Sequence, residues 1–432
     1  MEKILRSIEK LIPKKLYRAG QPIYHYLLAL AGAILYRFPS RRIKVIAITG
    51  TKGKTSTTEI LAKILETAGY KVATTSTLQF KIGDKIRRNL YKMSMPGRMF
   101  MQKFLREAVA AGCDFAILET TSEGAKTFRH KFIDFNGLIF TNISPEHIEA
   151  HGSFEKYLEA KLEYAIALEK SSKKNKTLVA NADDVEAGKF FQRAPSAKQI
   201  SFTLHDAEPF EISENESRLT IDGEKINTKL PGKFNLYNIL GAAKMARVFG
   251  VSALDIKKAI ESLDQIRGRM EKVSINLPAQ AGNPHQNFEV IVDYAHTADS
   301  LAQAYEALGV KHKICILGSC GGGRDQWKRP QMGQVADKYC DVIILTNEDP
   351  YDEDPHHIIC DVAKGITKDH LEIFDRREAI AKALSLATPG SAVIITGKGT
   401  DPYIMGPNGS RQEWDDATVV REELRKLLAG SF

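Results

Sequence analysis

From residue 43 onward, short apolar runs alternate with longer stretches in which apolar residues recur every three or four positions. The short runs fit buried strands, and the longer period fits helices that pack on a sheet. This alternation is typical of βαβ units, which build mostly parallel sheets. In the first half of the chain, the predicted strands are residues 43–49, 115–119, 138–142 and 177–181, and the first predicted helix is residues 55–68.

The pattern changes between about residues 200 and 230, where apolar and polar residues alternate around Asp222-Gly223. This predicts an antiparallel hairpin, which we assign to the edge of the central domain. A second βα series begins near Arg267, with predicted strands at 288–294, 314–318, 342–346 and 392–396.

We therefore predict an α/β protein in three parts. Residues 1–42 form a basic and apolar helical segment. Residues 43–266 form a central P-loop-type domain with a doubly wound, mostly parallel sheet and a small antiparallel accessory sheet. Residues 267–432 form a C-terminal Rossmann-like α/β domain.

Composition agrees with a folded protein of several domains. The chain has 432 residues, of which 43% are hydrophobic and 26% charged, so disordered and fibrous classes are excluded. The five cysteines are scattered, and none forms a CxxC pair. This spacing excludes a disulfide scaffold or zinc ribbon and fits a reducing cytosol.

The net charge of +8 is concentrated at the N-terminus. Residues 1–42 carry nine Lys or Arg against two Glu, which gives +7, and the other 390 residues carry 52 basic and 51 acidic groups, which gives +1. The body of the protein is thus nearly neutral, and we expect no nucleic-acid binding there. Any attraction to anionic lipid belongs to the N-terminal segment.

That segment contains an apolar stretch at residues 23–36. Fourteen residues are too few for a transmembrane helix, which needs about 20. Arg37, Arg41 and Arg42 follow where a signal-peptide cleavage site should lie. Two interpretations remain open: a helix packed on the domain behind it, or a helix at a membrane surface. We expect a cytoplasmic protein, with a peripheral contact of residues 1–42 to the inner face of the membrane under the second interpretation.

The strongest local signal is the segment ITGTKGKTST at residues 48–57, between a predicted strand and a predicted helix. Glycines let backbone N–H groups approach phosphate oxygens, Lys54 can reach the terminal phosphates, and Thr55 can offer a hydroxyl oxygen to Mg²⁺. Ile48 stands where the usual P-loop has its first glycine. The expected ATP-binding residues of this loop are Gly50, Thr51, Gly53, Lys54, Thr55 and Ser56.

The variant TGTxGKT resembles the Mur ligase family, with folylpolyglutamate synthase as a related type. The resemblance covers about residues 43–428. It is greatest to the MurE type, which adds the third residue to UDP-N-acetylmuramoyl-L-alanyl-D-glutamate. The resemblance implies a monomeric, ATP-dependent amide ligase of peptidoglycan precursor synthesis that adds an amino acid, such as a diamino acid, through an acyl phosphate.

Three further residues resemble the metal site of this family. Glu119 ends a predicted strand and His147 follows the next one, so both are expected at the carboxyl edge of the sheet. Lys161 matches the lysine of the YxxAK motif, 14 residues after His147. The resemblance implies two Mg²⁺ ions held by Thr55, Glu119, His147 and Lys161, with Lys161 carbamylated by CO₂.

Three short motifs resemble those around the nucleotide: GKFNLYN at 232–238, GRME at 268–271 and DYAH at 293–296. The first implies adenine contacts. The second places an arginine near the γ-phosphate, where it can stabilise charge in phosphoryl transfer. The third implies a ribose contact. The residues concerned are Asn235, Asn238, Arg269, Asp293 and His296.

The substrate motifs match only in part. Arg324 lies in GGGRD and implies a grip on the carboxylate of the incoming amino acid, and Arg129 implies contact with the nucleotide-linked acceptor. The DNPR motif of diaminopimelate-adding enzymes is replaced by EDPY at 348–351. Glu348, Asp349 and Asp401 are the expected amino-acid-binding acids, which suit lysine or another diamine at least as well as diaminopimelate.

The family also carries about a hundred residues before the phosphate loop that bind uridine, whereas this sequence has 42 before residue 43. Either uridine is held differently, or the acceptor is presented in another form, such as lipid-linked. Folylpolyglutamate synthase and a degenerate nucleotide-binding membrane scaffold stay as alternatives. Intact Lys54, Glu119, His147 and Lys161 argue against the scaffold.

Overall fold

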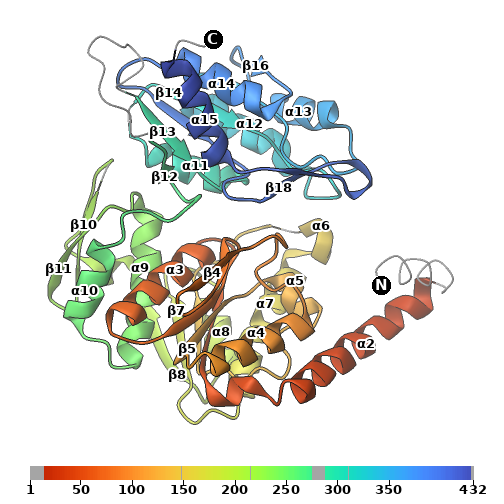
Figure 1. The fold of residues 1–432 in the computed structure, drawn as a ribbon, viewed down its shortest axis with the longest axis vertical. Coiled ribbons are helices and arrows are strands. Elements are labelled where there is room, and N and C mark those ends of the chain that lie inside the picture. The colour runs from red at the N-terminus through yellow and green to blue at the C-terminus, as the bar shows by residue number, and fades with distance from the viewer. Residues whose placement is uncertain (1–13, 147, 215, 275–287, 310, 430–432) are drawn as a thin grey trace. The chain divides into compact units, whose positions relative to one another are not determined.

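An eight-stranded sheet forms the centre of the first half of the computed structural model, which describes residues 14–146, 148–214, 216–274, 288–309 and 311–429 (Figure 1). Its strand order is β4-β3-β2-β5-β1-β6-β7-β8, and β3 and β4 are antiparallel to the rest. The predicted mostly parallel sheet is confirmed. Its strands are β1 (Lys44–Thr49), β2 (Val72–Thr75), β3 (Gln79–Ile82), β4 (Lys85–Arg88), β5 (Phe115–Glu119), β6 (Gly137–Phe140), β7 (Thr177–Asn181) and β8 (Lys198–Phe202).

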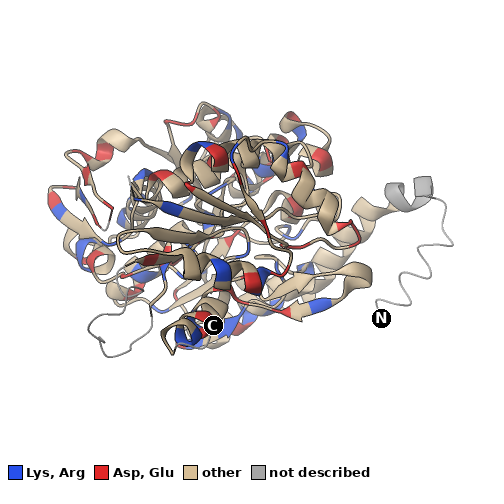
Figure 2. Cartoon of the chain, turned by 90° about the horizontal axis from the view of Figure 1, so that it is seen from above, with Lys and Arg blue, Asp and Glu red and all other residues tan. Residues whose placement is uncertain are grey.

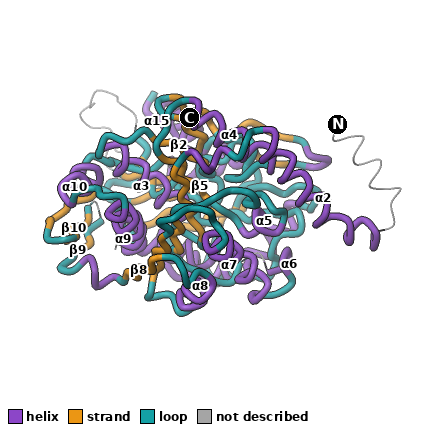
Figure 3. Tube along the Cα trace, turned by 90° about the horizontal axis from the view of Figure 1, so that it is seen from below, coloured by secondary structure: helices purple, strands orange, loops and turns teal. Residues whose placement is uncertain are grey.

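Helices cover both faces of this sheet (Figure 3). Side chains of α4, α7 and α8 share one hydrophobic core with alternate residues of the strands. On the other face, the later turns of α9 reach the strands, since Gly241 lies against Ile139 of β6. The helices of this half are α2 (Lys14–Leu35), η1 (Pro39–Arg42), α3 (Lys54–Thr67), α4 (Arg98–Ala110), α5 (Ser122–Lys126), α7 (Phe154–Glu169), α8 (Ala187–Arg193) and α9 (Lys233–Val248).

A six-stranded sheet in the order β12-β13-β17-β14-β15-β16 organises the C-terminal half, and all its pairs except β12–β13 are parallel. Separate hydrophobic cores fill its two faces, which confirms the predicted Rossmann-like layers. The strands are β12 (Glu271–Lys272), β13 (Glu289–Val292), β14 (Lys313–Leu317), β15 (Val342–Leu345), β16 (Leu371–Glu372) and β17 (Ala392–Ile395), and a hairpin of β18 (Tyr403–Met405) and β19 (Arg411–Glu413) follows.

The helices of the C-terminal half lie on both faces of this sheet, with α14 and α15 contributing to one core and α11, α12 and α13 to the other. Their bounds are α11 (Ala298–Glu306), α12 (Lys328–Tyr339), α13 (Pro355–Ala363), α14 (Arg376–Leu386), η3 (Pro407–Gly409) and α15 (Asp416–Leu428). The remaining helices are α6 (Ile148–His151), η2 (Leu204–Ala207) and α10 (Ala253–Glu261).

The predicted hairpin is present as β10 (Ser217–Ile221) and β11 (Glu224–Thr228), which pair with β9 (Glu211–Ile212) in a small antiparallel sheet. Asp222 and Gly223 both have positive φ, as a tight two-residue turn requires. The turn residues therefore specify this hairpin locally.

Contacts divide the chain into two units in a way that differs from the predicted boundaries. The first unit holds the described residues up to Ser144, with Glu155–Thr203 and Gly241–Ser252. The second holds Pro145–Phe154, Leu204–Leu240 and the described residues from Ala253 onward. The hairpin thus groups with the second unit, not with the central sheet, and the boundaries after residues 42 and 266 stay predictions.

One cysteine pair departs from what the expected reducing cytosol would favour. Cys315 in β14 and Cys340 at the end of α12 form a disulfide, whereas Cys113, Cys320 and Cys360 are free. The two partners are 25 residues apart and meet only because the helix returns beside the strand. Sequence spacing alone carried no signal for this pair.

The N-terminal helix α2 packs on α4 through small side chains, and Ala29 and Ala33 are buried. This supports the interpretation of a helix packed on the domain that follows it. None of the described helices is long and apolar enough to span a membrane.

A buried ion pair ties α14 to α15 in the second unit. The Arg376 guanidinium donates two 2.8 Å hydrogen bonds to the Asp416 carboxylate, and both side chains are at most 1% exposed. Trp414 Nε1 donates to the same carboxylate at 2.8 Å. The pair is fully hydrogen-bonded, which is the condition under which a buried charge is tolerated.

We expect Asp416→Ala to lower the free energy of unfolding by about 3–5 kcal/mol, because it leaves the Arg376 charge buried without a partner. Urea unfolding followed by circular dichroism measures this. Lys229→Ala is the matched control, since Lys229 pairs with Asp264 while their side chains are 64% and 73% exposed, and it should cost about 1 kcal/mol or less. Equal losses in the two variants would contradict the assignment.

Candidate functional site

The loop between β1 and α3 is shaped by two glycines. Gly50 has a positive φ, and a Cβ there would collide with Thr141 Oγ1 and lie 2.9 Å from the Asn142 carbonyl. Gly53 also has a positive φ and precedes the first turn of α3. The backbone therefore turns directly into a helix N-terminus, the positive end of the helix dipole, which attracts anions.

The end of β6 holds this loop in place. Thr51 N and Lys52 N donate to the carbonyl and side-chain oxygen of Asn142 at 2.8 and 3.0 Å. Thr141 Oγ1 donates to the Lys52 carbonyl at 2.7 Å. The hydroxyls of Thr51 and Tyr157 lie 3.0 Å apart. The loop is thus preorganised by residues that the sequence analysis did not single out as binding residues.

Two amines are directed at the loop carbonyls. Lys54 Nζ donates to the Thr51 carbonyl at 2.7 Å, and Lys161 Nζ donates to the Gly50 carbonyl at 2.6 Å. Lys161 is 2% exposed, and its amine lies 4.7 Å from the centre of the Tyr157 ring. The structure therefore brings both predicted lysines to the same loop.

Thr55 and Glu119 meet beside the loop, as predicted for a metal site. Thr55 Oγ1 donates to Glu119 Oε2 at 2.9 Å. Thr77 donates to the same carboxylate through its backbone N–H and its hydroxyl, at 2.9 and 2.7 Å. Glu119 is 2% exposed. This set of oxygen atoms suits a hard cation such as Mg²⁺. His147 lies outside the described residues.

A second carboxyl group, Glu59, lies behind this cluster and accepts hydrogen bonds from Ser76 Oγ and Gln79 Nε2, both at 3.1 Å. Burial raises the pKa of Glu59 from its ordinary 4.5 to about 7. The negative charge of Glu119 raises this pKa further, whereas the two hydrogen bonds lower it. Between these two pH values, the folded chain therefore holds a proton that the unfolded chain releases.

It follows that the Glu59 contribution to the free energy of unfolding falls as the pH rises from 4.5 to about 7. We expect Glu59→Gln, which mimics the protonated acid, to match the unchanged chain near about pH 5 and to exceed its stability near about pH 8. Urea unfolding at both pH values measures the difference. A difference that does not vary with pH would contradict this prediction.

The nucleotide motifs of the second unit form a compact group. Asp293 accepts hydrogen bonds from the backbone N–H groups of Met270 and Ala295, both at 2.7 Å, while burial raises its pKa. The Arg269 guanidinium lies 4.4 Å from the centre of the Tyr294 ring. The sequence segments 268–271 and 293–296 are therefore brought side by side by the pairing of β12 with β13.

His296 and the two asparagines have partners within the same unit. His296 Nε2 lies 3.1 Å from the Glu146 carboxylate, so the residue before His147 contacts the DYAH motif. Asn238 Nδ2 donates to Asn235 Oδ1 at 3.1 Å, and Asn235 Nδ2 donates to the Pro231 carbonyl at 2.7 Å. Both asparagines are 4% exposed.

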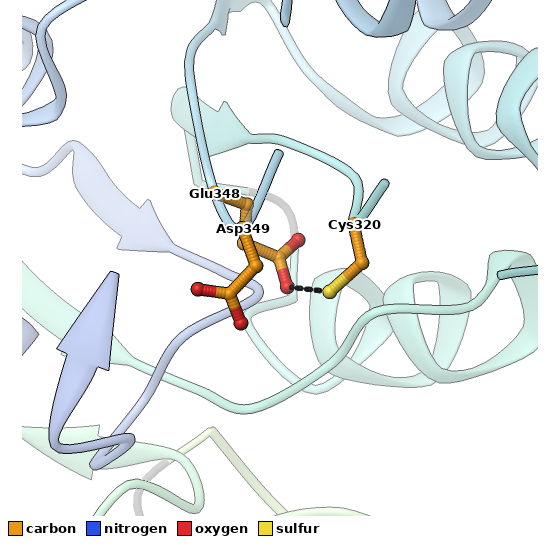
Figure 4. A group of neighbouring side chains, drawn as sticks. All are labelled: Cys320, Glu348 and Asp349. Atoms are coloured by element: carbon orange, nitrogen blue, oxygen red, sulfur yellow. Dashed lines mark hydrogen bonds between the residues drawn. The ribbon is translucent and has the colours of Figure 1, made fainter. Parts of the chain in front are cut away.

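Glu348 and Asp349, which follow β15, lie beside Cys320, which follows β14 (Figure 4), and Asp401 follows β17. Cys320 Sγ donates to Glu348 Oε1 at 2.9 Å, whereas Glu348 Oε2 is buried and has no hydrogen-bond partner among the described residues. Lys398 Nζ lies 2.8 Å from Asp349 and 3.3 Å from Asp401. Two of the three predicted acids thus share one ion-pair partner, a lysine that the sequence analysis did not assign.

Ligand atoms of Cys320, Glu348 and Asp349 lie within 4.8 Å of one another, the arrangement of a cation site. Burial raises the pKa of Cys320 to about 12, so its sulfur is a protonated thiol. Because the Lys398 ammonium already supplies the positive charge, this group does not fit a further metal ion. Arg324 lies within electrostatic range of Cys320 and Glu348.

Arg129 belongs to a cationic group in the first unit. Its guanidinium donates to the Met95 carbonyl, and burial lowers its pKa. Arg98 lies beside it, donates to the Thr127 carbonyl at 2.7 Å and contacts His25 Nδ1 of α2 at 2.6 Å. Burial and these two arginines lower the pKa of His25 to about 4, so the imidazole is neutral and accepts this bond. Arg98 was missed from sequence because its helix carries no motif.

Comparisons with known proteins agree over most of the chain. Residues 48–246 match the family model of the Mur ligase middle domain, and residues 268–399 match that of the Mur ligase glutamate ligase domain. The UDP-N-acetylmuramoyl-L-alanyl-D-glutamate–2,6-diaminopimelate ligase of Syntrophomonas wolfei is 36% identical over 92% of this chain and 81% of that protein. The UDP-N-acetylmuramyl-tripeptide synthetase of Roseiflexus is 33% identical over 93% and 82%.

Solved structures show the same fold. A structure of a UDP-N-acetylmuramoyl-L-alanyl-D-glutamate–2,6-diaminopimelate ligase, 28% identical, covers 89% of this chain and 79% of its own with a TM-score of 0.58. Folylpolyglutamate synthase of Mycobacterium tuberculosis with ADP covers 94% of each chain with a TM-score of 0.70. At 16% identity, the second likeness concerns the fold alone.

Proposed function

Because this chain belongs to the Mur ligase family, we propose that it joins an amino acid to the D-glutamate of UDP-N-acetylmuramoyl-L-alanyl-D-glutamate or a closely similar acceptor, at the expense of ATP. The reaction is an ATP-dependent amide ligation in the synthesis of the peptidoglycan precursor. The observation that carries the proposal is the phosphate loop, whose backbone is fixed by Asn142 and faced by Lys54 and Lys161.

The loop residues Gly50–Ser56 bind the phosphates of ATP, and Lys54 turns from the Thr51 carbonyl to the terminal phosphates. Thr55 and Glu119, whose oxygens are 2.9 Å apart, would hold Mg²⁺. Glu119 together with His147 would hold a second ion, and a carbamylated Lys161 would help to bind Mg²⁺. Mg²⁺ neutralises phosphate charge when it is bound. The burial of Lys161 supports the carbamate, because burial disfavours the protonated amine and only a neutral amine reacts with CO₂.

The residues of the chain support two steps. An oxygen of the acceptor carboxylate attacks the γ-phosphorus, ADP leaves, and an acyl phosphate forms. Lys54 and Arg269 stabilise the charge that develops on the phosphoryl group. The amine of the amino acid then attacks the acyl carbon, phosphate leaves with its bonding electron pair, and the amine proton is released as the amide forms. Asn235, Asn238, Asp293 and His296 contact the nucleotide in this proposal.

Amino-acid selection rests on Arg324 and Glu348. A guanidinium pairs with the α-carboxylate in a two-point geometry. Asp349 and Asp401 are engaged by Lys398, so that of these three acids Glu348 alone has a buried oxygen for which the described residues offer no hydrogen bond. An unsatisfied buried acceptor costs about 1–3 kcal/mol, which a side-chain ammonium of the substrate would offset. A diamino acid such as lysine therefore fits this group.

The acceptor is assigned to a cationic group of the first unit. Arg129, together with Arg98, offers positive charge to an acidic acceptor in the first unit. The enzyme acts as a monomer in the cytoplasm, and residues 1–42 contact the inner face of the membrane.

We expect Lys54→Ala to reduce ATP turnover by at least about 10³-fold, because charge stabilisation of the phosphoryl group is lost. ADP release with the acceptor and an amino acid measures this. Lys63→Ala, which removes an amine from the same helix but away from the loop, is the control and should retain turnover. Loss of turnover in the control alone, or in neither variant, would reject the loop as the catalytic site.

A panel of amino acids tests the substrate. With ATP and UDP-N-acetylmuramoyl-L-alanyl-D-glutamate, we expect phosphate release and a product of higher mass with diamino acids. Glu348→Gln should raise the KM for the diamino acid by at least about tenfold with little change in kcat, because a charge-assisted hydrogen bond becomes a neutral one. Glu372→Gln, at an exposed acid of β16, should change neither value.

If none of the amino acids in the panel gives phosphate release, the proposed acceptor is contradicted. Release with monoamino acids at the same KM would instead contradict the role of Glu348.

A further inference from the structure

Helix α2 packs on the first unit through its smallest residues. Ala29 and Ala33 are at most 1% exposed, and Gly32 lies so close to α4 that a Cβ there would be 3.0 Å from Met99 Sδ. His25, on the same side, contacts Arg98 of α4. This inner face of α2 (His25, Ala29, Gly32 and Ala33) lets the two helices approach closely and fixes the orientation of α2.

The opposite side of α2 exposes large apolar side chains. Ile23, Leu27, Ile34 and Leu35 are between 57% and 65% exposed, and Tyr24 is 52% exposed. At about 100° of rotation per residue, these five residues lie within about 120° of one another around the helix. We call them the outer face of α2. A helix on a protein surface normally turns polar residues toward water, so this arrangement is reversed.

The charges around this outer face have one sign. From Lys10 to Arg42, the sequence contains seven Lys or Arg residues and no Asp or Glu. Arg37 and Arg42, which follow the helix, are exposed. Figure 2 shows no acidic residue on the described part of α2. Like charges disfavour a second copy of the chain as the occupant of this face, whereas they attract an anionic surface.

We propose that the outer face of α2 docks on the surface of an anionic lipid bilayer, with the helix lying in the plane of the interface. The leucine and isoleucine side chains enter the boundary between headgroups and acyl chains, tyrosine stays at headgroup level, and the flanking basic residues contact lipid phosphates. This inference rests on the membrane contact within the proposed function and identifies the partner and the residues, but it does not depend on the ligase chemistry.

Co-sedimentation of the full chain with lipid vesicles tests the proposal. We expect binding to vesicles with about 30% phosphatidylglycerol, weaker binding to pure phosphatidylcholine, and a decrease as salt rises. The double variant Leu27→Gln/Ile34→Gln should bind anionic vesicles at least about tenfold more weakly, because it removes two apolar side chains from the interface. Both positions are more than half exposed, so the fold should be retained.

Leu254→Gln is the matched control, since Leu254 is 49% exposed on α10 in the second unit, and it should bind vesicles like the unchanged chain. Circular dichroism and ATP turnover of the double variant should be unchanged. No binding to anionic vesicles, or equal binding by the double variant, would overturn the proposal.

Light scattering compares the oligomeric state of the unchanged chain with that of the double variant. Dimers of the unchanged chain together with monomers of the double variant would show that a second copy, and not lipid, occupies the outer face. Vesicle binding by a chain without ligase activity would uphold this inference while rejecting the proposed reaction. The two failures are therefore distinguishable.

Discussion

The close approach of Gly50 to the end of β6 is the constraint on which the proposed nucleotide site depends. No side chain fits between the loop backbone and Thr141, and the same contact aligns the loop for hydrogen bonds to Asn142. Because β1 and β6 are neighbours in the sheet, strand pairing fixes the loop before any ligand arrives. Lys54 and Lys161 donate to the carbonyls of this loop, and Thr55 at its end donates to Glu119 at the end of β5.

Much of this arrangement follows from the sequence, because its signals are local. Apolar runs bounded by turns predicted β5 and β7 at their observed bounds, and Asp222-Gly223 predicted the hairpin. The glycines before Lys54 predicted the phosphate loop. Each of these features is decided by residues close together in the chain. Residue types at the turns and the spacing of apolar residues are therefore sufficient to identify them.

Contacts between distant segments could not be predicted in this way. Thr77 reaches Glu119 only because β2 lies beside β5, and Lys398 reaches Asp349 only because β17 and β15 flank β14. The latter contact engages Asp349, so that of the acids Glu348, Asp349 and Asp401 only Glu348 has a buried oxygen for which the described residues offer no hydrogen bond. Strand order therefore decides which of several similar carboxylates is paired with a lysine and which is not.

A crystal structure with a non-hydrolysable ATP analogue and Mg²⁺ tests the central claim most directly. The account predicts that the γ-phosphate lies within hydrogen-bond distance of Lys54 Nζ and of backbone N–H groups of the loop, with a metal ion in contact with Thr55 Oγ1. A triphosphate bound elsewhere in the chain, with the Lys54 amine still on the Thr51 carbonyl, would contradict it.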